Sequence, residues 1–269
     1  MQKITSIKEY KRSNLFHKII IISSQMLILI LFIFLWEILS HYKIIDPFLV
    51  SSPSAIFSLL KTYIINDALF IHIKTSVIET LIGLIIGTFL GFIIATLLYL
   101  LPTLEKILDP YLVVLNALPK TALAPILIIW AGTNIKGIVT ISISLSIVIS
   151  IISILSYFKS VDNNLIKMMK TMEANKIQIL FKVIYPSNLE NLLSVIKVNI
   201  GMSWVGVIVG EFLVSREGIG YLVVYGGQVF KLDLVMMGVI ILAFIALIMY
   251  EFVHLIEIMV HKQRNKIHH

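Results

Sequence analysis

Residues 157–186 read YFKSVDNNLIKMMKTMEANKIQILFKVIYP and form the longest polar interruption in the apolar second half of the chain. The oxygens of Asp162, Asn163 and Asn164 can accept hydrogen bonds from the free N–H groups of a first helical turn, so a helix is expected to begin here. Pro186 cannot continue a helix interior, so this helix should end or bend just before it. Its apolar residues recur at three- and four-residue spacing, which places them on one helical face: Leu165, Met168, Met169, Met172, Ile179, Leu180 and Val183.

An amphipathic helix of this kind has two interpretations. It can lie in the headgroup layer of a membrane with its five lysines towards anionic lipid. It can instead offer its apolar face to a soluble partner as a docking helix. The periodicity alone supports both equally.

The composition identifies an integral membrane protein. Hydrophobic residues make up 58% of the chain and charged residues 14%, and the mean hydropathy is +0.98, whereas about 25% of the residues of a soluble protein are charged. The chain has no cysteine, which excludes disulfides and thiolate chemistry. In a membrane protein, the net charge of +7 reflects lysines and arginines kept on the cytoplasmic side rather than nucleic-acid binding.

Six apolar runs are long enough to cross a bilayer as helices. We predict an all-α transmembrane domain over residues 19–260, with a basic cytoplasmic arm at 1–18, a polar loop at 158–186 and a cytoplasmic tail at 261–269. With both termini inside, the inner segments hold 14 lysines and arginines and the outer segments 6, which favours this orientation. The predicted spans are about 19–39, 76–100, 107–131, 136–157, 188–213 and 234–257.

Small residues in the second span stand four apart, at Gly83, Gly87 and Gly91. Such a stripe lets another helix approach closely, so helix packing is the main interpretation and a gating role the alternative. In the third span, Asn116 and Lys120 flank a proline. An ionisable residue at membrane depth is a candidate for the translocation path.

The fifth span carries Ser203, Trp204 and Glu211. We expect Glu211 to brace an outer gate, with Ser203 and Trp204 lining the path below it. The alternative is an interfacial glutamate that faces headgroup water.

No motif predicts an enzyme. Residues 132–137 have the glycine spacing of a phosphate loop, but Ile138 and Val139 follow where lysine and serine or threonine are needed. His254 shares a helical face with Glu251 and Glu257, which we interpret as an interfacial cluster rather than a metal site. We therefore expect no catalytic residue, no metal and no cofactor in this chain.

Four separate patches resemble one family, the permeases of type I ATP-binding cassette (ABC) importers, and within it the nitrate, sulfonate and taurine group. The patches are DPFLVSSPSAIFSLL at 46–60, LPKTALAPILIIWAG at 118–132, TMEANKIQILFKVIYP at 171–186 and WVGVIVGEFLVSREGIGYLV at 204–223. The third patch is similar to the second half of the family's Glu-Ala-Ala…Gly…Pro loop motif. It departs from that motif, because Glu173 stands at the glycine position and Lys167 at the glutamate position.

The resemblance implies a MetI-like permease core with a cytoplasmic coupling helix that docks onto ATPase subunits. It implies a second permease copy, two cytoplasmic ATPases that bind the ATP, and an external solute-binding protein. The solute would be small and anionic (sulfonate-, nitrate- or taurine-like) or similar to a thiamine precursor. Because glutamate disfavours the bend that glycine permits, a straighter helix through Glu173, or a contact from Glu173 to the ATPase, is expected. The expected coupling residues are Leu165, Met168, Met169, Met172, Glu173, Ala174, Ile179, Leu180 and Pro186.

Two other function classes remain from the sequence. A secondary transporter or channel driven by an ion gradient is the main alternative, but the spans carry few ionisable groups and no inverted repeat is evident. A membrane-embedded enzyme would need a catalytic constellation that the sequence does not show.

Overall fold

Long apolar helices dominate the computed structural model, which describes residues 7–267. The first six residues of the predicted basic arm, with Lys3, and the last two of the tail lie outside the described residues. Among the described residues, five helices are long and apolar enough to cross a membrane, and one bent pair of helices meets the same criterion when its two arms are taken together. The five are α1 (Ile7–His41, apolar from Ile19), α4 (Ala68–Leu100), α7 (Ile135–Lys159), α11 (Leu189–Val214) and α13 (Leu232–Ile267). The all-helical prediction is confirmed over the described residues, which contain no strand.

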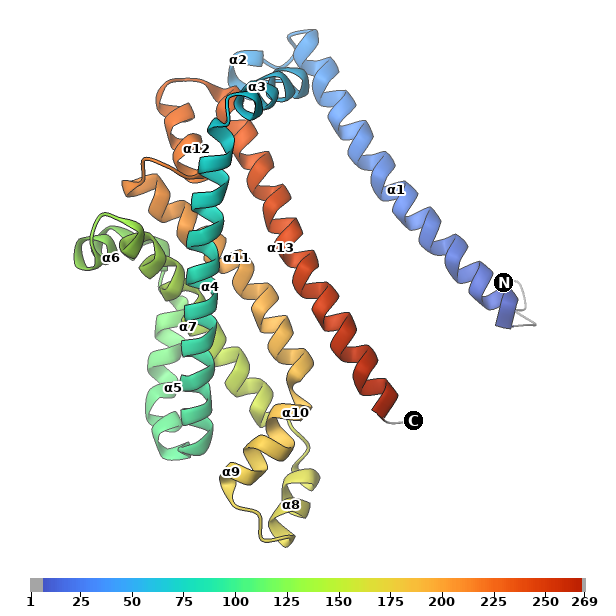
Figure 1. The fold of residues 1–269 in the computed structure, drawn as a ribbon, viewed down its shortest axis with the longest axis vertical. Coiled ribbons are helices and arrows are strands. Elements are labelled where there is room, and N and C mark those ends of the chain that lie inside the picture. Colours follow the sequence, from blue (N-terminus) through green and yellow to red (C-terminus); the bar gives the residue numbers. More distant parts are fainter. Residues whose placement is uncertain (1–6, 268–269) are drawn as a thin grey trace.

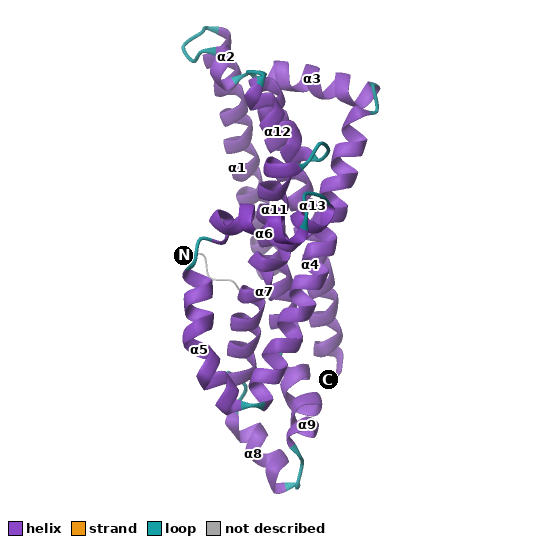
Figure 2. Cartoon of the chain, turned by 90° about the vertical axis from the view of Figure 1, so that its left-hand side faces the viewer, coloured by secondary structure: helices purple, strands orange, loops and turns teal. Residues whose placement is uncertain are grey.

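Shorter helices connect the spans at both ends of the molecule (Figures 1 and 2). At one end lie α2 (Pro47–Val50), α3 (Pro53–Ile65) and α12 (Ile219–Gln228). At the other end project α8 (Asn163–Thr171) and α9 (Lys176–Ile179), which a π-helical turn (Leu180–Ile184) and α10 (Tyr185–Ser187) join to α11. The chain ends of α1 and α13 both point away from the end that carries α2 and α3.

The helix α7 forms the centre of the bundle, between α4 and α11 (Figure 1). On one side it meets the glycine stripe of α4, which consists of Gly83, Gly87 and Gly91. A Cβ atom added at any of these glycines would overlap the serine opposite it on α7. We call these three serines, Ser142, Ser146 and Ser150, the serine stripe. Glycine is therefore required for this close approach, as expected for small residues at a helix interface.

The packing of α7 against α11 is equally close. A Cβ atom at Gly206 would lie 2.5 Å from the Cα of Ser142, and one at Gly210 would lie 2.9 Å from the Cα of Ile138. The hydroxyl of Ser142 donates a hydrogen bond to the carbonyl oxygen of Ser203 at 3.2 Å. Ser142 therefore contacts both neighbouring helices.

The third predicted span, 107–131, is not one straight helix. It consists of α5 (Pro102–Ala117), a 3₁₀ turn (Lys120–Leu123) and α6 (Ala124–Ala131), and the two arms are bent by 84°. The break lies at Leu118, which has the extended backbone (φ −63°, ψ 136°) that a following proline imposes. Pro119 also has no N–H to donate, so α5 ends here.

Other boundaries differ from the predicted ones by a turn or more. The second span begins at Ala68 rather than Ser76, and the last helix continues past residue 257 to Ile267. Polar residues such as His72 and Lys74 limit the apolar run at the start of α4 but do not stop a helix. The helix α3 begins at Pro53, and the side chain of Ser52 caps its first turn.

The glycine stripe leads to a stability prediction. Gly87→Ala should destabilise the bundle by about 1–3 kcal/mol, because the added methyl group overlaps Ser146 in a closely packed interface. The measurement is the apparent melting temperature of the purified chain. Gly201→Ala is the matched control, since a Cβ atom at Gly201 has no neighbour within 4 Å. In a helix, alanine should be neutral or stabilising there by up to about 1 kcal/mol. Equal effects of the two variants would contradict the packing interpretation.

Candidate functional site

The coupling segment, residues 158–186, projects beyond the spans at the end opposite α3 (Figure 1). Its helix α8 begins where the sequence predicted, because the carboxylate of Asp162 accepts a hydrogen bond from the N–H of Asn164 at 2.8 Å. Val161, just before the cap, is buried in the core beside Phe158. The start of α8 is therefore fixed both by its cap and by an apolar contact.

The expected straight helix through Glu173 is wrong. Glu173 has φ +59°, a left-handed backbone conformation, and α8 ends just before it. The N–H of Ala174 then bonds the carbonyl of Met169 at 3.0 Å, as in a helix that is closed by a left-handed residue. Asn175 and Gln178 form a reciprocal capping box that starts α9. The bend that the family's glycine permits is thus kept with a glutamate in its place.

This bend divides the predicted apolar face into two parts. Ile179 and Leu180 are buried in the chain's own core, at 5% and 2% exposure, so they are not available to a partner. Met169 and Ala174 pack partly against the same core. Three of the predicted coupling residues keep large exposed side chains: Leu165 at 41%, Met168 at 53% and Met172 at 70%. We call Leu165, Met168 and Met172 the exposed face of α8.

The helix does not end at Pro186, so of the two expected outcomes, an end or a bend before this proline, the first is wrong. The chain widens into the π-helical turn at Leu180–Ile184, continues through Pro186 in α10, and breaks only at Asn188. A wider turn relieves the clash between a proline ring and the carbonyl one turn earlier. The side chain of Asn188 donates to the carbonyl of Ile184 at 2.9 Å and stabilises the break.

Glu211 lies at the other end of the bundle and is buried, at 1% exposure. Its carboxylate accepts hydrogen bonds from the hydroxyl of Ser76 on α4 and from the N–H of Gly220 at the start of α12. Ser76 in turn accepts from the N–H of Ile219, and His72 accepts from that of Gly218. These contacts satisfy the free N–H groups at the start of α12 and join three segments. Glu211 therefore faces protein, not headgroup water, so the interfacial alternative is wrong.

The Gly-x-Gly pair after α11 is explained by this carboxylate. Gly218 has φ +105°, and a Cβ atom there would overlap the carboxylate of Glu211. A Cβ atom at Gly220 would lie 2.8 Å from the same group. The loop can close over Glu211 only because both residues lack side chains.

The other predicted path residues lie in different surroundings. Ser203 is fully buried where α11 meets α7, and Trp204, at 6% exposure, packs with residues of α4 and α13. Asn116 and Lys120 lie at the bend of the third span, where the Lys120 ammonium donates to the carbonyl of Asn116 at 3.2 Å. Lys120 thus satisfies a carbonyl at the end of α5. A role of these four residues in the path stays a prediction.

Several polar residues at these sites were missed from the sequence. Glu79 is 3% exposed, and its carboxyl group lies against that of Glu211. An acidic residue inside an apolar span is itself a sequence signal that could have identified it. Asn199 donates to Thr88 at 2.8 Å and to Ser150 at 2.6 Å, which ties α11 to α4 and α7. These partners are distant in sequence, so no local pattern predicts them.

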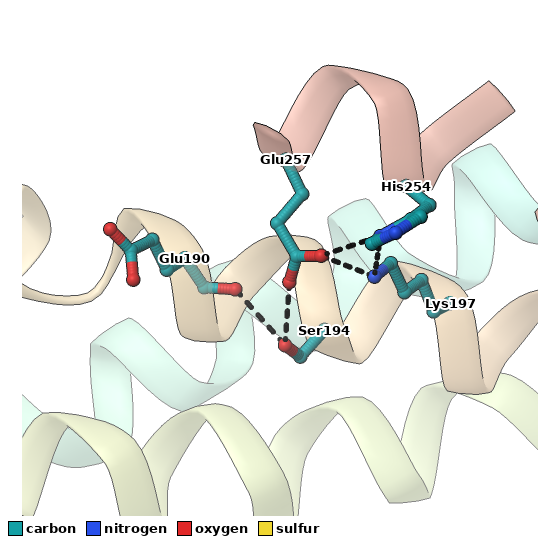
Figure 3. Close-up of polar contacts among 5 residues, drawn as sticks. All are labelled: Glu190, Ser194, Lys197, His254 and Glu257. Carbon is teal, nitrogen blue, oxygen red and sulfur yellow. Dashed lines mark hydrogen bonds and ion pairs between the residues drawn. The ribbon is translucent and has the colours of Figure 1, made fainter. Parts of the chain in front are cut away.

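A second polar cluster joins α11 to α13 towards the coupling end (Figure 3). The ammonium of Lys197 donates to the carboxylate of Glu257, and the Nδ1 atom of His254 lies 3.1 Å from both groups. Ser194, one turn before Lys197, donates to the carbonyl of Glu190. We call Lys197, His254 and Glu257 the α11–α13 clasp. Glu251, which the sequence grouped with His254, is exposed and lies outside this clasp. The described residues contain no group of three ligands suited to a metal.

Comparisons with known proteins agree with this fold. The family model described as "Binding-protein-dependent transport system inner membrane component" matches residues 87–262. The chain is 28% identical to a putative aliphatic sulfonates transport permease protein, SsuC of Bacillus subtilis, over 86% of this chain and 84% of that protein. It is 29% identical to the formylaminopyrimidine transport permease protein ThiX of Halalkalibacterium halodurans, over 70% and 74% of the two chains. A solved structure of the MetNI methionine ABC transporter in inward-facing conformations has a TM-score of 0.60 at 16% identity, over 70% of this chain and 96% of that one.

The Glu211 network predicts a local effect. Glu211→Gln should loosen the start of α12, because an amide cannot accept both hydrogen bonds and one buried donor loses its partner, at about 1–3 kcal/mol. Faster hydrogen exchange at residues 219–221 and lower uptake are expected, with unchanged abundance in the membrane. Glu251→Gln is the control, since that glutamate lies on the exposed side of α13 and outside this network. Unchanged exchange and uptake in Glu211→Gln would contradict the bracing role.

The clasp predicts a difference between two neighbouring acids on α13. Glu257→Gln removes the charged partner of Lys197, whose side chain is only 12% exposed, and should destabilise the chain by about 1 kcal/mol. Glu251→Gln, on the exposed side of the same helix, should have no measurable effect. The melting temperatures of the two variants provide the comparison. If the two variants had the same melting temperature, the clasp would not contribute to the stability of the chain.

Proposed function

Since this chain belongs to the family of binding-protein-dependent transport system inner membrane components, it is the permease of a MetI-type ABC importer, and we propose how it couples to its partners. In this proposal two cytoplasmic ATPase subunits dock on the coupling segments of two permease copies. An external solute-binding protein delivers the solute to the opposite end. ATP is bound by the ATPases, and this chain carries no cofactor of its own.

The observation that carries the coupling proposal is the exposed face of α8. Leu165, Met168 and Met172 are large apolar side chains on a segment that projects beyond the spans, and they keep 41%, 53% and 70% of their surface exposed. Met is unbranched and polarizable and suits adaptable docking surfaces. A groove on the ATPase would remove this face from water, which is worth roughly 1.5–3 kcal/mol for each fully buried side chain.

The connection between the coupling segment and the spans supports transmission of movement. The residues after Glu173 run through α9, the π-helical turn and α10 into α11. Ile179 and Leu180 anchor this path in the core that contains Phe158 of α7. A displacement of α8 would therefore be passed to the central helices, which could rock between inward and outward access.

The charge distribution supports the proposed orientation. The coupling segment carries five lysines, and the predicted inner segments hold most of the basic residues. We place the coupling segment and both termini in the cytoplasm, and α3 and α12 at the outer face. The gate that Glu211 braces then lies on the side from which the solute arrives.

The solute is proposed to be a small polar organic molecule. The two relatives named above are described as permeases for aliphatic sulfonates and for formylaminopyrimidine, so both an anionic and a thiamine-precursor-like solute stay open. A transporter driven by an ion gradient, the alternative from the sequence, is a different class from the family to which the chain belongs.

A charge on the exposed face should release the ATPase. Met168→Asp and Met172→Asp each place a carboxylate that would be desolvated without a partner, at a cost of several kcal/mol. Less ATPase should co-purify with these variants, while the spans insert normally. The matched control is Met172→Leu, which keeps an apolar side chain of similar size.

A helix that lies on lipid gives the opposite result. The ATPase would then stay bound to both aspartate variants, and neutral replacements of Lys167, Lys170 and Lys176 would have the larger effect, on membrane association of the segment. Full retention of the ATPase by Met168→Asp and Met172→Asp would show the coupling assignment to be wrong.

A further inference from the structure

A cavity of about 510 Å³ opens near the buried Glu211 network. Three parts of the chain enclose it: the first turns of α4, the turn between α6 and α7, and the loop after α11. The polar residues that form its wall include Glu79, Asn134, Arg216 and Glu217. In the proposed orientation it faces the outside, so a solute released by the binding protein can reach it.

Glu79 forms part of this wall although only 3% of its surface is exposed. Its Oε2 atom is fully buried and receives no hydrogen bond from any described residue. The neighbouring carboxylate of Glu211 is already engaged by Ser76 and Gly220 and has no donor to offer as a carboxylate. A buried acceptor without a donor is costly, so a donor supplied from the cavity would be bound favourably.

The charged residues around the cavity indicate which hydrogen-bond donor group of a solute could bind there. Glu79 and Glu217 line it, and Glu211 lies directly behind Glu79. Arg216, which is exposed, is the basic residue in this wall. Acidic side chains therefore outnumber the one guanidinium, which lies near solvent. A simple anion would meet two acidic side chains, whereas an amino group would meet the acceptor that lacks a donor.

We propose that this cavity is a solute subsite for an amino group, with Glu79 as its acceptor and Arg216 as the partner of an anionic group on the same molecule. This inference rests on the proposed importer function and deepens it. The solute is then an amino compound, either zwitterionic or an amino-substituted ring, and not a simple anion such as nitrate or an unsubstituted alkanesulfonate. Of the two kinds of solute named for the relatives above, formylaminopyrimidine offers nitrogen donors to Glu79 but no anion to Arg216, and an aliphatic sulfonate fits both residues only if it also carries an amino group.

Two pairs of probes that differ only in the amino group test the subsite. Taurine is compared with ethanesulfonate, and 4-amino-2-methylpyrimidine with 2-methylpyrimidine. Binding of each probe to the full-length permease in lipid nanodiscs is measured by calorimetry, without ATPase or binding protein. In at least one pair the amino compound should bind about tenfold or more tightly than its partner, as expected for one hydrogen bond to a charged group.

Three variants assign the preference to Glu79. Glu79→Gln keeps the size of the side chain but loses the charge, and should reduce the amino preference to about twofold or less. Glu79→Asp keeps the charge but withdraws the carboxylate by one methylene, and should weaken the preference to an intermediate value. Asp109→Asn removes an acid on the exposed surface of α5 and should change nothing. The melting temperature of each variant shows that it is folded.

Three outcomes would overturn the inference. They are the absence of measurable binding by either amino compound, equal binding within both pairs, and an amino preference that survives Glu79→Gln. If the amino preference survived Glu79→Gln, Glu79 would not bind the solute, and its only partner would be the carboxyl group of Glu211. The coupling proposal is tested separately by ATPase co-purification, so the subsite can fail while the importer function stands.

Discussion

The contact between the glycine stripe of α4 and the serine stripe of α7 determines how closely the central helices approach. Hydrophobic burial cannot drive this approach in a bilayer, because lipid tails are as apolar as leucine side chains. Close van der Waals contact and hydrogen bonds must provide it instead. Glycines on both α4 and α11 let α7 come near enough for Ser142 to bond the Ser203 carbonyl and for Asn199 to bond Ser150. The positions of α4, α7 and α11 follow from these contacts.

This three-helix centre brings together the polar residues that the spans bury. Glu211 and Glu79 meet because α11 and α4 both pack against α7 and against each other, and the start of α12 supplies a donor to Glu211. The carboxylate in turn requires glycine at positions 218 and 220. The hydrogen bonds from Ser76 and from the start of α12 explain how an apolar bundle can tolerate this buried acidic group.

The coupling segment shows how a motif can be kept in geometry while it changes in sequence. Glu173 has a left-handed backbone, which is sterically unfavourable for a residue with a Cβ atom. Two features fix the chain directly after Glu173. They are the capping box of Asn175 and Gln178, and the burial of Ile179 and Leu180. These contacts therefore stabilise the bend, although a glutamate by itself disfavours the left-handed backbone conformation.

The sequence by itself determined the class of the protein and most of its helices. Runs of about 20 apolar residues can only be spans, the cap at Asp162 is a local signal, and the four patches pointed to the permease family. The glycine stripe also indicated the packing face of α4, but in the coupling segment only the tertiary structure decided which residues face protein. Ile179 and Met172 share a period, yet one is buried and the other exposed, because the bend at Glu173 turns α9 towards the core. The Glu79–Glu211 pair and the α11–α13 clasp join residues more than 50 positions apart, and a local pattern carries no information about such contacts.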